Sequence, residues 1–307
     1  MMSFNGTSLL APMEGVTDII FRQVVARAAR PDVLVTEFTN VSSYYHERGR
    51  ANALERLAFL PSEKPITPQI WGINPEHFAV TARGLVELGY ENIDINMGCP
   101  EKHVVATGGG SALIKTPELA SQIINTTKSA GLPVSVKTRL GYLRVDEWRD
   151  WLMHVLQHDL SALTIHLRTK KEMSKVAAHH ELIPDIIALR NQIAPQTELY
   201  LNGDFTDLDS NQKYIDMGAD GIMIGRGVFA NPFCFEREPR EHNREELIKL
   251  LRYHLDLFDQ YAPKPYDPLK RFFKIYINNF PGASDIRVRL METTNTTEAR
   301  QILDVIE

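Results

Sequence analysis

Short apolar segments rich in β-branched residues recur through the first three quarters of the chain. There are eight of them, at residues 9–13, 33–38, 66–72, 92–98, 134–141, 162–168, 199–204 and 221–227. Most are continuous runs rather than alternating patterns, which is typical of strands that are buried on both faces. The pattern therefore predicts eight buried strands.

Segments with the helical spacing of apolar residues lie between several of these strands. They cover residues 21–29, 78–88, 119–128, 148–157 and 183–193. Pro117 precedes one of them, as a proline at a helix start does. Gly89 and Gly131 each follow one, as glycines at helix C-termini do. Alternation of strands and helices implies that the strands pair in parallel.

Eight strand–helix units indicate an α/β fold closed into a (β/α)8 barrel of the TIM type. A doubly wound open sheet is the alternative. It is less favoured because the dinucleotide-binding glycine pattern GxGxxG is missing after the first strand. The length of 307 residues suits one such barrel with a small addition.

The pattern changes after about residue 240. Apolar residues share one face of a predicted helix over residues 244–260. Pro263, Pro265 and Pro268 interrupt the helical pattern, which resumes over 269–280 and again from residue 296 to the end. The strand pattern does not return. We predict a barrel domain over residues 1–240 and a small all-helical domain over residues 241–307.

The composition is that of an ordinary globular protein, with 43% hydrophobic and 24% charged residues, which excludes a mainly disordered, collagen-like or coiled-coil chain. The net charge of −5 gives no sign of a generally nucleic-acid-binding surface but does not exclude a local basic face. Two cysteines, Cys99 and Cys234, make no disulfide framework and favour a reducing compartment such as the cytoplasm. We expect no signal peptide, no membrane span and no metal site, because the corresponding patterns are missing.

Residues suited to catalysis or ligand binding gather at the C-terminal ends of the predicted strands, where barrel enzymes place their active sites. They are Pro12, Met13, Glu14, Glu37, Gln69, Asn96, Cys99, Lys137, Arg139, His166, Arg168, Asn202, Gly203, Asp204, Gly225 and Arg226. A single lysine or histidine at such a position is usually a solvated side chain. Because most of the strands carry a polar group at the same end, we predict an active site there.

The loops after the last two strands predict a ligand that carries a phosphate. Residues 202–204 and 225–227 are glycine-containing turns, and the loops at these places in a barrel frequently bind phosphate. A helix start near residues 230–232 would add its positive end, and Arg226 would add a forked cation. Two tight turns without a ligand are the alternative, which the pairing of both turns at these strands disfavours.

Lys137 and Cys99 carry the candidate chemistry. Lys137 lies inside a predicted buried strand, where an ammonium is costly unless it meets an anion or a cofactor oxygen. It could tune a bound flavin or act as the Schiff-base nucleophile of an aldolase, and the residues alone leave both open. Cys99 precedes the glycine run 108–110, which could let its loop act as a lid. We expect Cys99 to be reactive and Cys234 to be a small buried hydrophobic residue.

The motifs together resemble one family, the tRNA-dihydrouridine synthases. The resemblance rests on APMEGVTD, INMGCP with the following GGGSALIK, PVSVKTRLG, TIHLRT, LNGD and GIMIGRG, and on KRFFK and NNFPGA near the C-terminus. It covers essentially the full chain. INMGCP together with VKTRLG is highly specific, whereas IGRG is common among phosphate-binding barrels. APMEGVTD and TEFTNVSSYYHERG resemble the branch that modifies position 16 of tRNA, with positions 17, 20 and 20a left open.

The resemblance implies an FMN-dependent enzyme that reduces the C5–C6 bond of a D-loop uridine in tRNA, with NADPH as the reductant. FMN would contact Pro12, Met13, Glu14, Gln69, Lys137 and His166, and its ribityl chain and phosphate would lie on Asn202, Gly203, Asp204, Gly225 and Arg226. Cys99 would be the general acid, Asn96 would hydrogen-bond the uracil, and Arg139 and Arg168 would lie close to the nucleotide. We expect a cytoplasmic monomer without a metal.

The chain departs from the family after Arg168, where it reads KKEMSKVAAHHELI in place of an aromatic-and-glycine stretch. His179 and His180 either replace the family's contacts from this loop or are surface residues, and we expect a surface position for at least one.

The predicted helical domain carries an excess of basic residues between residues 264 and 289. The basic residues are Lys264, Lys270, Arg271, Lys274, Arg287 and Arg289, against Asp267 and Asp285. We expect Lys270, Arg271 and Lys274 to grip tRNA through its phosphates. An amphipathic helix with a solvated basic face is the alternative.

Three other functions stay open at this point. An FMN barrel oxidoreductase acting on a small molecule, similar to the dihydroorotate dehydrogenases, would share the phosphate loops and the lysine but would not need the basic helical tail. A flavin-free phosphate-sugar barrel such as a Schiff-base aldolase is the second. A non-catalytic RNA-binding protein is the third, and it leaves the pair of Cys99 and Lys137 unexplained.

Overall fold

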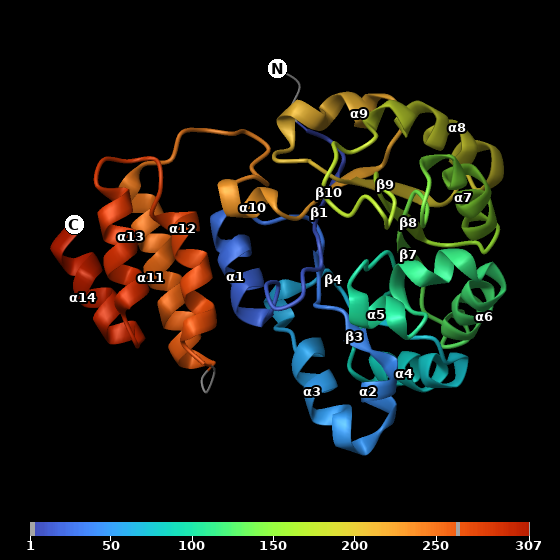
Figure 1. Ribbon diagram of the computed structural model, residues 1–307, viewed down its shortest axis with the longest axis horizontal. Helices are drawn as coiled ribbons and strands as arrows, with labels where there is room; N and C mark the ends of the chain where they lie inside the picture. The colour runs from blue at the N-terminus through green and yellow to red at the C-terminus, as the bar shows by residue number, and fades with distance from the viewer. Residues whose placement is uncertain (1–3, 262–264, 307) are drawn as a thin grey trace.

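The computed structural model describes residues 4–261 and 265–306 (Figure 1). Short parallel strands form at all eight predicted apolar segments. Their bounds are β1 Thr7–Leu10, β2 Leu34–Val35, β3 Thr39–Asn40, β4 Ile66–Thr67, β5 Gln69–Trp71, β6 Ile93–Met97, β7 Val134–Arg139, β8 Ala162–His166, β9 Glu198–Asn202 and β10 Gly221–Ile224. The predicted α/β class is confirmed.

Two of the predicted strands are divided. The second segment forms β2, and β3 follows it after the irregular residues 36–38. The third segment forms β4 and β5 on either side of Pro68. Because a proline has no backbone N–H, it cannot donate a ladder hydrogen bond at this position.

The strands close into a parallel barrel. One sheet has the order β1-β10-β9-β8-β7-β6-β5-β3, and β2 pairs with β4. An isolated parallel bridge between Leu9 and Val33 joins the two ends of this circuit. There the Leu10 N–H donates to the Val33 carbonyl, and the Val33 N–H donates to the Ser8 carbonyl, both at 3.1 Å. The predicted barrel is therefore confirmed.

Helices cover the outside of the barrel. They are α1 Ile19–Ala28, α2 Val41–Tyr45, α3 Glu47–Leu57, α4 Pro75–Glu87, α5 Lys102–Ala106, α6 Pro117–Lys128, α7 Trp148–Leu156, α8 Ile183–Ile193, α9 Gln212–Asp216 and α10 Gly227–Ala230. The five helices predicted between strands are all present, with ends shifted by at most a few residues. Short 3-10 turns occur at η1 Pro61–Glu63, η2 Gly110–Lys115, η3 Val145–Glu147, η4 His180–Leu182 and η5 Asp209–Asn211.

The predicted helix start near residues 230–232 is wrong. The single-turn helix α10 begins at Gly227, directly after Arg226, and ends at Ala230. Asn231 is extended, with φ −143° and ψ 108°. It precedes Pro232, and a residue before proline is disfavoured in the helical region. The proline therefore ends this helix rather than starting one.

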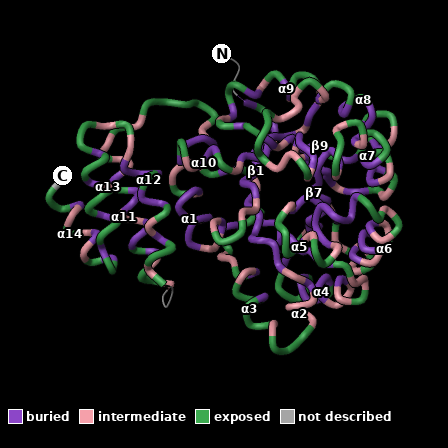
Figure 2. The backbone as a smooth tube through the Cα atoms, in the orientation of Figure 1, coloured by how far each residue is buried: buried purple, intermediate pink, exposed green. Residues whose placement is uncertain are grey.

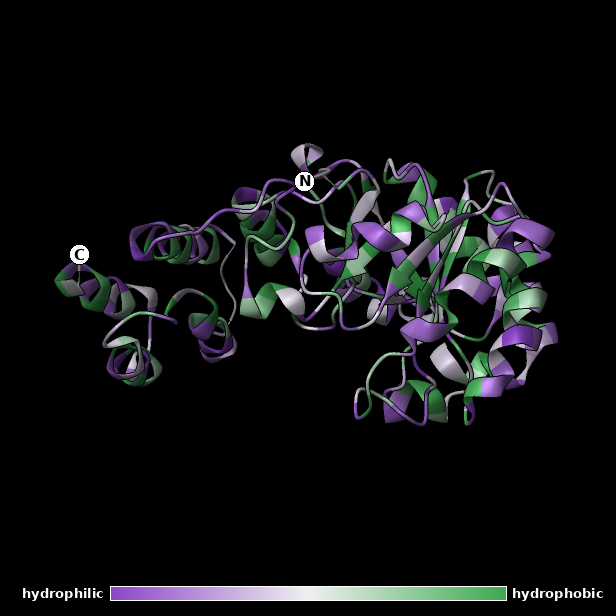
Figure 3. Cartoon of the chain, turned by 90° about the horizontal axis from the view of Figure 1, so that it is seen from above, coloured by the Kyte–Doolittle hydropathy of each residue, from purple (hydrophilic) through white to green (hydrophobic). Residues whose placement is uncertain are grey.

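The chain after residue 240 is helical throughout its described part. It contains α11 Arg244–Gln260, η6 Asp267–Phe272, α12 Phe273–Tyr276, α13 Ala283–Glu292 and α14 Thr296–Ile306. The prediction for 244–260 is confirmed, whereas the predicted helix 269–280 is only η6 followed by one turn, and α13 was not predicted. Pro263 and Lys264 lie outside the described residues. These helices, which we call the tail, stand beside the barrel next to α1 (Figures 1 and 3).

The apolar core continues from the barrel into the tail. The ring of Phe21 in α1 stacks on Phe272 of the tail at 4.8 Å between centroids, and on Phe229 of α10 at 6.2 Å. His254 of α11 lies 5.2 Å from the Phe272 ring. Figure 2 shows buried positions both in the strands and along the inner sides of the tail helices. The tail is thus fixed to the barrel by shared aromatic packing.

Within the described ranges, no helix has both the length and the apolar character needed to cross a membrane.

One buried ion pair fastens α1 to the segment before β4. Arg22 Nε lies 2.8 Å from Glu63 Oε1, and the two side chains are 1% and 2% exposed. Arg22 also donates to the carbonyl oxygens of Thr17 at 3.0 Å and Ala58 at 2.8 Å. The pair is well satisfied, and this is the condition under which a buried pair is tolerated.

Removing one partner of this pair should destabilise the fold strongly. We expect Arg22→Ala to lower the free energy of unfolding by ~3–5 kcal/mol, because Glu63 would be left as an uncompensated buried charge. Urea unfolding followed by circular dichroism measures the change. The control is Arg144→Ala, which breaks the exposed pair with Asp146 and should leave the urea midpoint unchanged. Equal midpoints for the two variants would contradict the assignment.

Candidate active site at the C-terminal end of the barrel

A cavity of about 420 Å³ opens at the C-terminal ends of β1 and of β7 to β10. Its walls carry most of the predicted cofactor residues, namely Pro12, Met13, Lys137, His166, Asn202, Gly203, Asp204, Gly225 and Arg226. Phe205 and Thr206 add to the wall and were not predicted. Because parallel strands all end at one rim, residues from five separate strands meet in this cavity.

Lys137 lies half-buried on the wall of this cavity. Its Nζ donates to Asn202 Oδ1 at 3.3 Å, which uses one of three ammonium protons. Burial, together with the charge of Arg139, lowers the pKa of Lys137 to about 8, while Asp94 opposes this shift. The ammonium is therefore still mainly protonated at pH 7 and is available to an acceptor in the cavity.

His166 is a neutral imidazole. Burial and the charges of Arg139 and Lys137 hold the pKa of His166 well below its ordinary value. Arg168 Nη1 lies 3.1 Å from His166 Nε2. Because a guanidinium can only donate, Nε2 accepts and the ring proton is assigned to Nδ1.

Asp204 connects the loops that follow β8, β9 and β10. Its carboxylate accepts from Arg168, from the Ala178 N–H at 2.9 Å and from Arg226 at 3.2 Å. Burial alone would raise the pKa of Asp204, but these hydrogen bonds and charges lower it. The carboxylate is therefore ionised and holds Arg226 at the cavity mouth, where the arginine side chain is 62% exposed.

The sequence predicts that Arg168 lies close to the nucleotide. In this structure its side chain is buried and hydrogen-bonded to neighbouring loops. Its side chain is 2% exposed and also donates to the Val176 carbonyl at 2.7 Å. Gly203, beside it, has φ +123°, and a Cβ there would lie 3.0 Å from His166 Cδ2. Glycine at this position therefore keeps the imidazole wall in place.

Gln69 and Asn96 lie beneath the rim, in a hydrogen-bond network inside the barrel. Gln69 Nε2 donates to Asp94 Oδ2 at 2.6 Å, and Asn96 Nδ2 donates to Gln69 Oε1 at 2.8 Å. Burial raises the pKa of Asp94, and hydrogen bonds from Ser135 and Gln69 oppose this. Gln69 is fully buried and is not on the cavity wall. Asp94 was missed, although an acid inside the predicted buried strand 92–98 carries the same signal as Lys137 in its strand.

Asn96 shapes the turn that leads to Cys99. Its Oδ1 accepts from the backbone N–H groups of Gly98 at 3.1 Å and Cys99 at 2.8 Å. The Cys99 carbonyl in turn accepts from the Ser111 N–H at 3.0 Å and the Ser111 hydroxyl at 2.9 Å. Gly110, with φ +55°, packs directly under this turn. The glycine run predicted as a lid hinge thus also allows close packing on the Cys99 loop.

Cys99 is 8% exposed and packs with Phe38, Trp71 and Val104. It lies next to a second cavity of about 190 Å³, whose wall includes Phe38, Trp71, Glu14 and Arg56. Glu14 faces this second cavity and pairs with Arg56 at 2.6 Å, rather than lining the cavity that holds Lys137. Burial raises the pKa of the Cys99 thiol, and the charges of Arg139 and Lys137 only partly offset this. The thiol is therefore neutral at pH 7.

Arg139 joins the loops after β6 and β8. It is buried and donates to the carbonyl oxygens of Gly98 at 2.7 Å and of Thr169 and Met173 at 3.1 Å. Burial lowers the pKa of Arg139 to about 10. These contacts support the Cys99 loop from below, whereas the predicted nucleotide contact stays a prediction.

Of the two histidines of the divergent loop, His180 contacts the wall of the cavity, whereas His179 bonds two glutamates of its own loop. His180 Nε2 bonds the Gly203 carbonyl at 2.8 Å, and its ring stacks on Phe205 at 4.8 Å. His179 lies between Glu172 and Glu181, at 2.9 and 2.8 Å. Both are half-buried, and the surface position expected for at least one of them stays a prediction. Cys234 is buried, as predicted. Across the described ranges, no group of three or more His, Cys, Asp or Glu side chains is arranged to hold a metal.

Four basic residues of the tail line a groove of about 480 Å³, together with Glu292. Its wall includes Lys270, Arg271, Lys274, Arg287 and Phe273. Lys270 pairs with Asp267 at 2.8 Å and is 14% exposed. Arg271 differs from its neighbours because it donates to the Gly15 carbonyl of the barrel.

Comparisons with known proteins agree with this site. A model of the dihydrouridine synthase (Dus) family matches residues 9–307. The chain is 54% identical over 303 residues to a probable tRNA-dihydrouridine synthase 2 of Bacillus subtilis (strain 168), covering 97% of this chain and 93% of that protein. It is also 54% identical over 306 residues to a probable tRNA-dihydrouridine synthase of Staphylococcus epidermidis (strain ATCC 35984), with coverages of 97% and 93%.

Two solved structures share the fold at low identity. Morphinone reductase in complex with tetrahydroNAD is 14% identical, with a TM-score of 0.50 and coverages of 93% of this chain and 94% of that chain. The 6-hydroxypseudooxynicotine amine oxidase of Pseudomonas geniculata N1 is 13% identical, with a TM-score of 0.54 and coverages of 76% and 46%. The barrel fold together with the family match defines an α/β-barrel oxidoreductase. The chain belongs to the dihydrouridine synthase family.

The protonation state of Cys99 can be measured directly. Because burial raises the pKa of this thiol, the reactive thiolate should form only at a pH above the ordinary cysteine value of about 8.5. We expect iodoacetamide to alkylate Cys99 in the folded protein at pH 7.5 at least tenfold more slowly than in the urea-unfolded chain. The rate should rise as the pH increases. Peptide mass spectrometry measures both rates, and fast labelling at neutral pH would contradict the assignment.

Proposed function

We propose that this protein reduces the C5–C6 bond of a D-loop uridine in tRNA, with FMN as the cofactor, NADPH as the reductant and Cys99 as the proton donor. The observation that carries the proposal is the buried, neutral thiol of Cys99 on the same barrel rim as Lys137 and His166, in a chain of the dihydrouridine synthase family. By the resemblance to the position-16 branch, uridine 16 is the proposed target, and a cytoplasmic monomer is the proposed form.

The residues of the 420 Å³ cavity fit FMN. Gly203 and Gly225 carry no side chain that would fill the space, since a Cβ at Gly225 would lie 3.3 Å from Ala11 Cβ. The exposed guanidinium of Arg226 suits a phosphate, and the Lys137 ammonium suits an oxygen of the ring system. Pro12, Met13, His166, Asn202 and Asp204 complete the proposed set. Contacts from Glu14 and Gln69 stay predictions, because neither side chain is on this wall.

FMN held by these residues would, in its reduced form, supply the hydride for C6 of the uracil. Lys137 places a positive charge beside the ring system. His166, being neutral, offers a hydrogen bond without adding a second charge. The carboxylate of Asp204 fixes Arg226 so that the phosphate end of the site is ordered before the cofactor binds.

Cys99 supplies the proton that completes the reduction. When a hydride adds to C6, negative charge develops toward C5 and O4 of the uracil, and C5 must then receive a proton. A neutral thiol can donate this proton, whereas a thiolate cannot. Burial against Phe38 and Trp71 therefore favours the protonated thiol of Cys99, which is the form that can donate the proton. Asn96 is proposed to bond the uracil, in exchange for part of its present contact with Gln69.

The target base must leave its stack to reach this rim, and the tail groove is proposed to hold the surrounding tRNA. Its basic side chains are Lys270, Arg271, Lys274 and Arg287. Phosphate contacts of this kind position an RNA without reading its sequence.

The first test removes the proposed proton donor. We expect Cys99→Ala to bind FMN with wild-type absorbance but to form dihydrouridine at least 100-fold more slowly, because a positioned acid contributes about 10²–10⁴-fold. NADPH-driven reduction of unmodified tRNA, followed by mass spectrometry of the nucleosides, measures the product and its position. Cys234→Ala, which removes the other buried thiol, should keep its rate within a few fold. A wild-type rate for Cys99→Ala would exclude the acid role.

The second test concerns the tail groove. We expect Lys270→Glu with Lys274→Glu to weaken tRNA binding and to lower the slope of log affinity against log salt by about 1–2, because each lost phosphate contact removes about 0.7–0.9. Filter binding at several salt concentrations gives the slope. Lys213→Glu on α9 reverses one charge on the barrel, half the change of the double variant, and serves as the control for a non-specific effect of charge. Equal slopes for the wild type and the double variant would exclude this groove as the tRNA site.

A further inference from the structure

We infer that Arg271 and Glu37 are positioning residues that fix the loop after β1, so that the tail helps to shape the cofactor cavity. The inference rests on the proposed function, because it concerns the cavity assigned to FMN. It also gives Arg271 a role different from the tRNA contact that the sequence suggests.

The loop after β1 is a compact turn. The N–H groups of Val16 and Thr17 both donate to the Met13 carbonyl at 3.0 Å. The Met13 N–H donates to Thr17 Oγ1 at 2.9 Å. Pro12 and Met13 line the proposed cofactor cavity at one side of the turn. Because the turn is internally bonded, a displacement of Gly15 will displace Met13.

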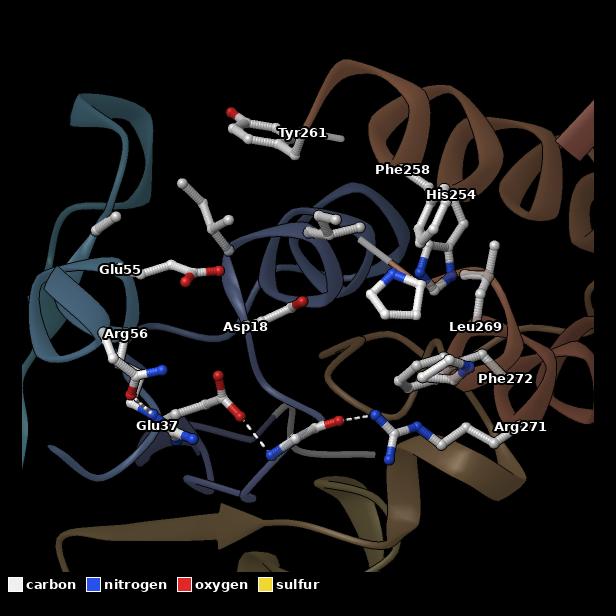
Figure 4. Close-up of a pocket in the computed structure, with 17 residues that line it drawn as sticks. Asp18, Glu37, Glu55, Arg56, His254, Phe258, Tyr261, Leu269, Arg271 and Phe272 are labelled. Carbon is white, nitrogen blue, oxygen red and sulfur yellow. Dashed lines mark hydrogen bonds between the residues drawn. The ribbon is translucent and has the colours of Figure 1, made fainter. Parts of the chain in front are cut away.

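Gly15 is held from two sides by side chains from distant parts of the chain. Its N–H donates to the carboxylate of Glu37, which follows β2, and its carbonyl accepts from Arg271 of η6 in the tail. Figure 4 shows both contacts as dashed lines that converge on the same residue. Gly15 has φ +65°, a conformation that glycine adopts without strain.

Glu37 is built into this position. It is 7% exposed, and burial together with the nearby charge of Asp18 raises the pKa of its carboxyl, while Arg56 opposes this. Burying a carboxyl group is costly unless it is hydrogen-bonded, and the Gly15 N–H provides such a bond. Arg56 also pairs with Glu14, the preceding residue of the turn, at 2.6 Å. Side chains from three separate segments therefore converge on residues 14 and 15.

Arg271 links two cavities of the molecule. It lines the basic groove of the tail and also a cavity of about 520 Å³ between barrel and tail, whose wall includes Glu37, Phe258 and Phe272 (Figure 4). Lys274 lines the groove but not this junction. A substitution of Arg271 should therefore disturb the loop after β1, whereas a substitution of Lys274 should not.

The test compares Arg271→Ala with Lys274→Ala in the full-length protein without tRNA. We expect Arg271→Ala to speed hydrogen exchange of the amides of residues 13–17 several-fold, and to raise the dissociation constant of FMN several-fold in a fluorescence titration. Lys274→Ala should match the wild type in both measurements, while binding tRNA more weakly. Arg271→Lys, which can still donate one hydrogen bond to the Gly15 carbonyl, should recover part of the loss.

Glu37 gives an independent pair of variants. Glu37→Gln keeps an oxygen that accepts from the Gly15 N–H, so the amides of residues 13–17 should exchange hydrogen at the wild-type rate. In Glu37→Ala these amides should exchange faster. Wild-type exchange and FMN affinity in Arg271→Ala would overturn the inference, whatever the activity on tRNA. If the wild type bound no FMN, the proposed function would fail, and the exchange measurement alone would still decide whether Arg271 and Glu37 fix the turn.

Discussion

Parallel closure of the sheet is the constraint on which the site depends. Because every strand runs in the same direction around the barrel, all their C-terminal ends meet at one rim. Lys137, His166 and Asn202 are separated by tens of residues in the chain but lie on one cavity wall for this reason. The parallel pairing of β1 with β10 brings the loop after β1, with Met13, to the same rim, and the bridge between Leu9 and Val33 closes the circuit on the other side of β1. Without closure the candidate residues would be spread along an open edge.

Burial sets the chemical state of each group at this rim. It lowers the pKa of Lys137 and His166 and raises that of Cys99, so a neutral imidazole and a neutral thiol lie on the same rim as the Lys137 ammonium. Charges then adjust each group, since Arg139 opposes the formation of a second cation at His166 and partly offsets the burial of Cys99. Such divergence among neighbouring groups is typical of active sites. The burial of these groups is therefore as important to the proposed chemistry as the identity of the residues.

The tail packs against the barrel and also contacts the loop after β1. Aromatic packing of Phe21 on Phe272 fixes the position of the tail against the barrel, and Arg271 extends from the tail to the loop after β1, which lines the 420 Å³ cavity. The basic groove of the tail, proposed to hold tRNA, and the cavity proposed for FMN are thus connected through one side chain. Under the proposed function, this arrangement couples the binding of tRNA in the groove to the geometry of the FMN cavity.

The sequence by itself determined the class of fold and the end of the barrel that carries the site. Continuous apolar runs report strands that are buried on both faces, and the helix over 244–260 follows from its spacing, because both signals are local. Only the tertiary structure decided what each polar side chain contacts. An arginine is usually an exposed cation. Arg139 and Arg168 are buried instead, because they bond carbonyl and carboxylate groups of other loops. Gln69 and Glu14 lie off the cavity wall because Asp94 and Arg56, residues distant in the chain, bind them elsewhere. Partners of this kind are set by three-dimensional proximity, which the order of residues along one chain does not encode locally.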